Sequence, residues 1–166
     1  TNFKDLFIIT GNAFKNERGQ LVETYKKDVF FKKFSFSTEL ELEVDSKKNV
    51  LRGMHYQVEP YAQAKIIRVT IGSILDVVVD LRKDSKTYGK NFSIILNDSD
   101  QKQLYVPEGF AHGYYVLSDI VRVVYKMNNI YNKKYAKGII YNDKELNIDW
   151  GIDKDPILSE KDKSLP

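Results

Sequence analysis

Two histidines, His55 and His112, are the residues of this 166-residue chain that could carry proton-transfer chemistry near neutral pH. His55 follows Arg52 and Gly53 at the predicted end of an extended segment. Because so few other groups titrate near neutrality, His55 is predicted to act as a base. The alternative is a structural histidine bonded to a backbone carbonyl, and this applies with more force to His112, in a turn that leads into a strand.

A lysine, two aspartates and a tyrosine share the apolar faces of predicted strands. Lys65 alternates with Ile67 and Val69, an unusual position for a lysine, although a strand-end lysine can also extend out to water. Asp76 and Asp80 share one face of their strand, and we expect one of them to point into the interior and be paired. Tyr125 fits either a buried aromatic or a proton donor.

Metal and cofactor chemistry has little basis in the sequence. The histidines lie 57 positions apart, which leaves only a site of two histidines and one carboxylate arithmetically possible, and we expect no metal. Glycine-rich phosphate loops and dinucleotide fingerprints are absent, so no cofactor is predicted.

The composition excludes several classes of protein. Lys plus Arg is 26 and Asp plus Glu is 23, and this net charge of +3 is spread along the chain, which argues against a nucleic-acid-binding protein. No cysteine is present, so there are no disulfides or thiolate ligands. No apolar run is long enough to span a bilayer, and the N-terminus lacks the features of a signal peptide, so a cytoplasmic location is expected.

Many short strands and little helix predict an all-β barrel or sandwich in one domain, residues 1–166. One helix is expected at Lys27–Phe34, with Val29, Phe30 and Phe34 as its apolar stripe, followed by an alternating strand from Phe34 to Val44 and a turn at Asp45–Asn49. The other predicted strands are Phe7–Ile9, Gln20–Thr24, a segment from Val50, Lys65–Ile71, Ile74–Leu81, Phe92–Leu96, Leu104–Val106, Gly113–Leu117 and Val121–Met127. Residues 132–166 are expected to form turns and a short helix packed on the barrel.

The motifs, taken in order, resemble the dTDP-4-dehydrorhamnose 3,5-epimerase family over nearly the whole chain. The blocks that carry the resemblance are Asn16–Gly19 with Glu23, Lys48–Gln57, Ala62–Lys65, Asp76–Arg82, Pro107–Gly113, Tyr125-Lys126, Asn142-Asp143 and Leu158–Asp162. The resemblance implies a cupin-like double-stranded β-helix, or jelly-roll, barrel. It also implies a homodimer that exchanges N-terminal strands, and epimerisation without cofactor or metal.

The resemblance also implies roles for individual residues. In the catalytic set, His55 matches the base, Asp162 the carboxylate that orients it, Lys65 the cation near the C4 oxygen of the sugar, and Tyr125 the acid on the opposite face. In the binding set, Arg52 matches a diphosphate contact, Arg18 and Glu23 match nucleotide contacts from the partner chain, and Gln57, His112 and Asp76 match polar residues near the substrate. The substrate implied is a nucleoside-diphosphate 4-keto sugar.

Three departures from the family pattern bear on the substrate. The chain has Gln20–Val22 where the family has phenylalanines, Leu40–Val44 where it has a polar pocket segment, and Ile130 where a second tyrosine is common. These changes favour a GDP-4-keto-heptose of bacterial capsule or lipopolysaccharide synthesis. The alternatives are a dTDP-4-dehydro-6-deoxyglucose 3,5-epimerase of the rhamnose pathway, a C3-only epimerase, a ketoisomerase and a non-catalytic sugar-binding cupin.

Overall fold

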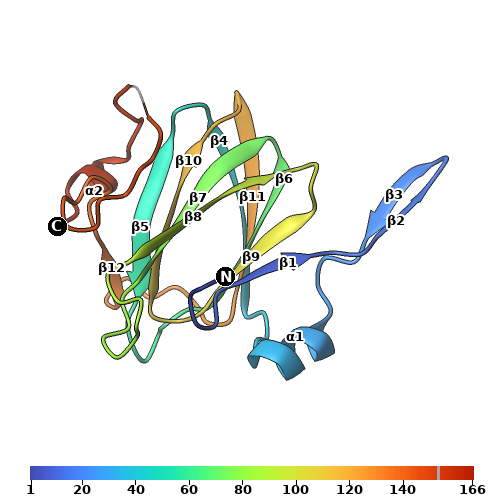
Figure 1. Ribbon diagram of the computed structural model, residues 1–166, viewed down its shortest axis with the longest axis horizontal. Coiled ribbons are helices and arrows are strands. Elements are labelled where there is room, and N and C mark those ends of the chain that lie inside the picture. Colours follow the sequence, from blue (N-terminus) through green and yellow to red (C-terminus); the bar gives the residue numbers. More distant parts are fainter. Residues whose placement is uncertain (153) are drawn as a thin grey trace.

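Two five-stranded antiparallel sheets face each other in the computed structural model, which describes residues 1–152 and 154–166. The first sheet has the order β1 (Phe7–Thr10), β9 (Lys102–Val106), β6 (Lys65–Ile71), β11 (Ile120–Met127), β4 (Leu40–Lys47). The second has the order β12 (Ala136–Gly138), β5 (Leu51–Gln57), β10 (Phe110–Val116), β7 (Ser73–Asp80), β8 (Asn91–Asn97) (Figure 1). The sheets form a jelly-roll barrel, which confirms the predicted all-β class.

The central strands of the second sheet are buried on both faces. Ile74 and Val78 of β7 join the core between the sheets, whereas Val77 and Val79 pack under the C-terminal segment with Trp150. A strand covered on both sides has no polar face, which explains why Ile74–Val79 is an almost continuous apolar run interrupted by Asp76. Two cores thus hold β7 rigidly on either side.

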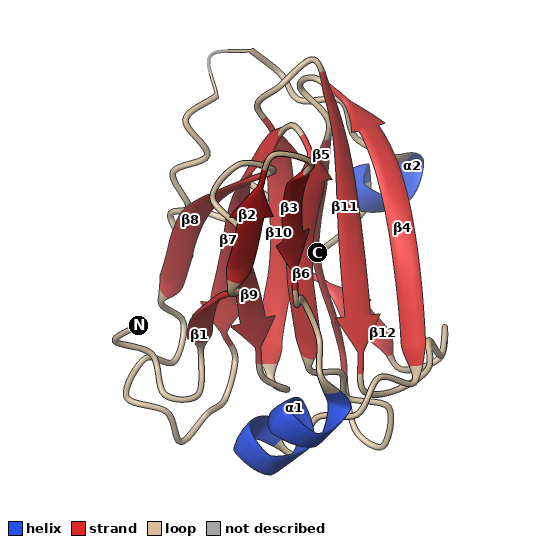
Figure 2. Ribbon diagram, turned by 90° about the vertical axis from the view of Figure 1, so that its right-hand side faces the viewer, coloured by secondary structure: helices blue, strands red, loops and turns tan. Residues whose placement is uncertain are grey.

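Helix α1 (Lys27–Phe34) covers one end of the first sheet, at the bottom of Figure 2. Its bounds are those predicted. Val29 was predicted to belong to the apolar stripe of this helix, but its side chain is 48% exposed. Phe30 packs with Phe36 and Ile66, and Phe34 stacks on Tyr105 at 4.4 Å between ring centroids. The left-handed Ser35 ends the helix.

The strand after α1 differs from the prediction in its bounds. β4 begins at Leu40 rather than Phe34 and continues to Lys47, through part of the predicted turn. β4 pairs with β11 along its full length, from Leu40 opposite Met127 to Lys47 opposite Ile120. The polar residues of the predicted turn are therefore an exposed strand edge, and the turn itself is Lys48-Asn49.

Strands β2 (Ala13–Asn16) and β3 (Gly19–Val22) form a separate hairpin that stands away from the barrel (Figure 1). β2 was not predicted, and β3 was placed at Gln20–Thr24. Phe14 and Leu21 pair across the hairpin and are 63% and 65% exposed. Such a pair of exposed apolar side chains on an isolated hairpin marks a surface that can bind a partner.

The C-terminal segment packs against β5. Ile139 exchanges two backbone hydrogen bonds with Met54, and Ile157 bonds to Asn49 and Leu51. The short helix α2 (Glu160–Lys163) follows and lies beside β5 (Figure 1). Among the residues described, no helix is long and apolar enough to cross a membrane.

Candidate active site

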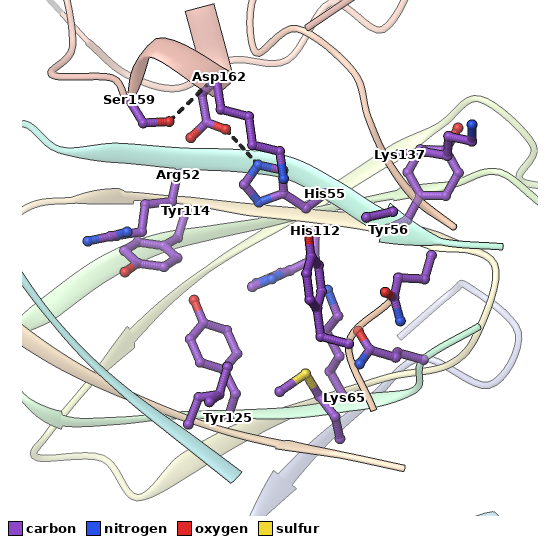
Figure 3. A pocket seen from close by; sticks show the side chains of 17 residues that line it. Arg52, His55, Tyr56, Lys65, His112, Tyr114, Tyr125, Lys137, Ser159 and Asp162 are labelled. Atoms are coloured by element: carbon purple, nitrogen blue, oxygen red, sulfur yellow. Dashed lines mark hydrogen bonds and ion pairs between the residues drawn. The ribbon is translucent and has the colours of Figure 1, made fainter. Parts of the chain in front are cut away.

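A pocket of about 370 Å³ opens between the two sheets. Its size is within the range of small-molecule sites. β5 and β10 of the second sheet form one wall, β6, β11 and β4 of the first sheet form the other, and α2 adds residues beside β5 (Figure 3). The lining residues are Leu42, Arg52, His55, Tyr56, Gln57, Gln63, Lys65, His112, Tyr114, Tyr125, Met127, Tyr131, Ala136, Lys137, Ser159, Lys161 and Asp162.

A bulge in β5 turns Arg52 and His55 into the same pocket. Residues three apart on a regular strand point to opposite faces. Here His112 pairs with His55 and Tyr114 with Arg52, so that three steps along β5 match two along β10. The extra residue reverses the alternation, and Arg52, His55, His112 and Tyr114 all line the pocket.

Two glycines make the bulge possible. Gly53 has φ of +122°, and a Cβ on it would lie 2.6 Å from the Cα of Gly113. A Cβ on Gly113 would in turn lie 2.8 Å from the carbonyl oxygen of Arg52. The strands therefore approach closely at this point only because neither residue has a side chain.

His55 is paired with Asp162. Its Nε2 lies 2.6 Å from Oδ1 of the carboxylate, which is buried, whereas the imidazole is 36% exposed. Burial opposes ionisation of Asp162, but hydrogen bonds from His55, the backbone of Gly53 and Ser159 outweigh it and lower its pKa. An ionised Asp162 holds Nε2 as the N–H nitrogen, so that Nδ1, which has no partner among the described residues, is free to accept a proton.

The capping of α2 fixes the carboxylate. Ser159 is the N-cap residue, and its hydroxyl accepts a hydrogen bond from the backbone N–H of Asp162 at 3.1 Å. A Ser three residues before an acidic residue is a common start signal for a helix. The block Leu158–Asp162 thus carries both the functional carboxylate and the residue that positions it.

A second histidine and aspartate lie beside the first pair. Nε2 of His112 lies 2.8 Å from Oδ2 of Asp76, and both residues are buried. Oδ1 of Asp76 has no hydrogen-bond partner among the described residues. Both aspartates of β7 are buried, rather than one as predicted, and Asp80 accepts hydrogen bonds from Arg82, Ser85 and Thr87 at the end of the strand.

Lys65 begins β6 and reaches into the pocket near Asp76. Burial lowers the pKa of its ammonium from 10.5 to about 8, although the negative charge of Asp76 acts in the opposite direction. At neutral pH Lys65 is therefore still a cation in a poorly hydrated place. Such a cation stabilises a negative oxygen far better than water does.

Tyr125 comes from β11, on the wall opposite His55 (Figure 3). Burial raises its pKa well above 10, and the neighbouring Tyr114 and Asp76 add to this effect. Its ring lies edge-on to His112, with 5.9 Å between centroids. A protonated phenol and a base thus face the cavity from different sheets, which suits removal of a proton on one side of a ligand and delivery on the other.

Three residues of the predicted site lie elsewhere or have other contacts. Arg18 and Glu23 are exposed on and just after the projecting hairpin and do not line this pocket. Gln57 lines the pocket, but its amide is bonded to the backbone of Tyr61, Ile130 and Asn132. These hydrogen bonds show that the side chain of Gln57 holds neighbouring backbone segments together in the pocket wall.

Several lining residues were missed by the sequence analysis. Tyr56 lies within the Lys48–Gln57 motif, and Tyr114 directly follows the Pro107–Gly113 motif. Lys137 and Lys161 come from the C-terminal segment, whose course the periodicity does not reveal. The only signal for Tyr114 was its spacing of two residues from His112, which places both side chains on the same face of a strand. Among the described residues, no cluster of three or more His, Cys, Asp or Glu has the geometry of a metal site.

Comparison with known proteins yields one consistent family. A family model described as dTDP-4-dehydrorhamnose 3,5-epimerase matches residues 1–166. The enzyme of that name from Shigella flexneri is 44% identical over 164 residues, covering 98% of this chain and 90% of the relative.

Two solved structures are closely similar. The dTDP-4-dehydrorhamnose 3,5-epimerase from Bacillus anthracis, with TDP and pyrophosphate bound, has a TM-score of 0.96 and 40% identity, covering 100% of this chain and 95% of the other. The dTDP-6-deoxy-D-glucose-3,5-epimerase from Legionella pneumophila, in complex with dTDP-4-keto-L-rhamnose, has a TM-score of 0.93 and 34% identity, covering 99% and 88%.

Proposed function

The chain belongs to the dTDP-4-dehydrorhamnose 3,5-epimerase family and is a carbohydrate epimerase, and from this we propose that it inverts C3 and C5 of a dTDP-linked 4-keto-6-deoxyhexose. The observation that carries the proposal is a pocket that a His–Asp pair and a protonated tyrosine line from opposite sheets, with a lysine ammonium in the same pocket.

The chemistry follows from the acidity of a carbon next to a ketone. A C–H bond there becomes removable when the negative charge that forms on the C4 oxygen is stabilised, which is the role we assign to Lys65. His55, oriented by Asp162, takes the proton from one face. Tyr125 then gives its phenolic proton to the other face of the enolate carbon, which inverts the centre.

The nucleotide is proposed to be dTDP rather than GDP. The altered segments predicted a GDP-heptose, but the relatives with high coverage are described by names that specify dTDP-sugars. Of the altered segment Leu40–Val44, Leu42 is a pocket residue. The segment Gln20–Val22 lies on the hairpin, away from the pocket. The changes therefore leave His55, Lys65, Tyr125 and Asp162 in place in the pocket.

The experiment offers dTDP- and GDP-linked 4-keto sugars to the protein in heavy water and follows deuterium at C3 and C5 by NMR. We expect both positions of dTDP-4-keto-6-deoxyglucose to exchange and invert. Exchange at C3 alone would assign a single epimerisation, and exchange with the GDP-linked sugars alone would overturn the dTDP assignment. No exchange with any of these sugars would contradict the proposed reaction.

We also propose that the protein works as a homodimer in which the β2–β3 hairpin of one protomer reaches the partner's pocket and places Arg18 and Glu23 near the nucleotide. The exposed Phe14 and Leu21 provide the apolar contact. Replacing both by Ser should convert the dimer to a monomer, which light scattering would measure, and should raise the KM for the nucleotide sugar. Ile95→Ser on the barrel, which removes a side chain that is 54% exposed, is the matched control and should change neither.

A further inference from the structure

Tyr114 is a buried tyrosine of the pocket wall that the reaction described above does not use. Its side chain is fully buried, yet its hydroxyl is 3.4 Å from the hydroxyl of Ser46 on β4. On its other side Tyr114 lies beside Tyr125, with 6.5 Å between the ring centroids, and hydrogen bonding with Tyr114 contributes to the raised pKa of the Tyr125 phenol (Figure 3). Ser46 is half-buried and also accepts a hydrogen bond from Nε of Arg52 at 3.0 Å.

The three hydroxyls form a chain from the edge of the barrel to the acid. A hydroxyl is both a donor and an acceptor and can rotate, so that it can receive one proton and pass on another. Ser46 is the member of the chain nearest to solvent, because Tyr114 is fully buried and the exposed part of Tyr125 lines the pocket that the sugar would fill. The chain therefore joins the acid to water by a route that does not pass through the substrate.

We propose that Tyr114 and Ser46 return a proton to Tyr125 between the two inversions, while the sugar remains bound. This inference rests on the proposed double epimerisation, in which one acid must act twice. After the first inversion Tyr125 is a phenolate and His55 carries the proton taken from carbon. Tyr114 gives its proton to the phenolate, Ser46 gives its proton to Tyr114, and water gives one to Ser46. The hydroxide formed is neutralised by the proton that His55 releases.

The surroundings favour such a relay. Burial makes the Tyr125 phenolate a strong base, which favours its reprotonation once the first inversion is complete. The positive charge of Arg52 acts in the opposite direction and favours the phenolate, which helps it persist until the proton arrives. The Ser46–Tyr114 contact of 3.4 Å is longer than the usual separation of about 2.7 Å, so this link must shorten for transfer and is expected to be the slowest.

The test separates the two inversions. With enzyme in excess over dTDP-4-keto-6-deoxyglucose in heavy water, Tyr114→Phe should carry out the first deuterium incorporation at nearly the wild-type rate. The second incorporation and the steady-state kcat should fall by about tenfold or more, with KM little changed. Small proton donors such as ammonium ion should partly restore kcat in this variant and have no effect on the wild type.

Two sets of controls keep the test specific. Tyr115→Phe removes a buried hydroxyl from the next residue of β10, where it donates to Asn49 at 2.8 Å, and should leave both incorporations unchanged. Ser46→Ala should lower kcat, and Ser46→Thr, which keeps the hydroxyl, should restore it. This pair carries the test if Tyr114→Phe fails to fold.

The outcomes distinguish this inference from the proposed function. An inactive wild-type protein would contradict the epimerase proposal itself. If the wild type is active, then an unchanged kcat in Tyr114→Phe and Ser46→Ala, or an equal loss in the first and second incorporations, would overturn the relay alone.

Discussion

Replacing Lys65 by Met should make the protein more stable and inactive. Met has a similar length and flexibility but no charge to desolvate. Lowering the pKa of Lys65 from 10.5 to about 8 corresponds to roughly 3 kcal/mol, at about 1.4 kcal/mol for each tenfold change in proton affinity. The lowered pKa already includes the favourable charge of Asp76, so this figure is the net cost of the buried ammonium and the upper limit of the gain at pH 7.

The gain should depend on pH in a defined direction. The pKa of Lys65 is lower in the folded than in the unfolded protein, so between about pH 8 and 10.5 the unfolded state binds more protons, and wild-type stability rises with pH through this range. The free-energy difference between Lys65→Met and wild type should therefore be largest below pH 8 and approach zero near pH 10.5.

Urea denaturation at several pH values measures this difference, and deuterium exchange measures activity. Lys48→Met, at a side chain that is 57% exposed, is the control and should change stability by less than about 0.5 kcal/mol. Wild-type exchange should also decline above about pH 8 as the ammonium loses its proton. A variant less stable than wild type at pH 7, or a stability difference independent of pH, would refute the reasoning about Lys65.

Other substitutions test the remaining parts of the site and its frame. His55→Asn should keep the melting temperature within a few degrees and abolish exchange, whereas exchange at the wild-type rate would remove His55 from the mechanism. Asp162→Asn should slow exchange by about a hundredfold through loss of the oriented base, and an unchanged rate would contradict that role. Tyr125→Phe should suppress net inversion more than the first proton removal, and equal effects on both, measured by NMR, would contradict its role as the acid. Asp80→Asn should lower the free energy of unfolding by about 3 kcal/mol. Hydrogen bonds from Arg82 hold the pKa of Asp80 far below its usual value despite burial. The loss of stability in Asp80→Asn should therefore be fully present above about pH 4 and become smaller in acid. A loss that stays constant down to pH 2 in urea titrations would contradict this.

Regular local patterns made much of the fold predictable. Lys27–Phe34 and Lys65–Ile71 have the predicted bounds, because a helical apolar stripe and a strand alternation are each read within a few residues. The start of β4 was misplaced because the alternating pattern already begins at Phe34, which is the last residue of α1. Ser35 is the cap of that helix, and the strand begins only at Leu40. The three residues of β12 owe their strand form to pairing with β5, which is not encoded locally.

The arrangement of the site was predictable only in part. Motif resemblance pointed to His55, Lys65, Tyr125 and Asp162, and the structure brings these four to one pocket. Alternation alone would have placed Arg52 on the opposite face from His55, since the bulge at Gly53 depends on the close approach of another strand. The position of Tyr114 between Ser46 and Tyr125 joins three strands, and such long-range contacts leave no periodic signal.

The separation of the hairpin from the barrel has an evolutionary consequence. The β2–β3 strands pair with each other and with no strand of the two large sheets in the described part of the chain. Substitutions at Gln20 and Val22, on either side of the dimer contact proposed for Leu21, can therefore accumulate without disturbing the packing that aligns the base, the acid and the cation. The nucleotide preference can in this way change through small neutral substitutions while selection acts separately on the catalytic residues. Exchange of this hairpin between relatives would allow the same change by protein engineering.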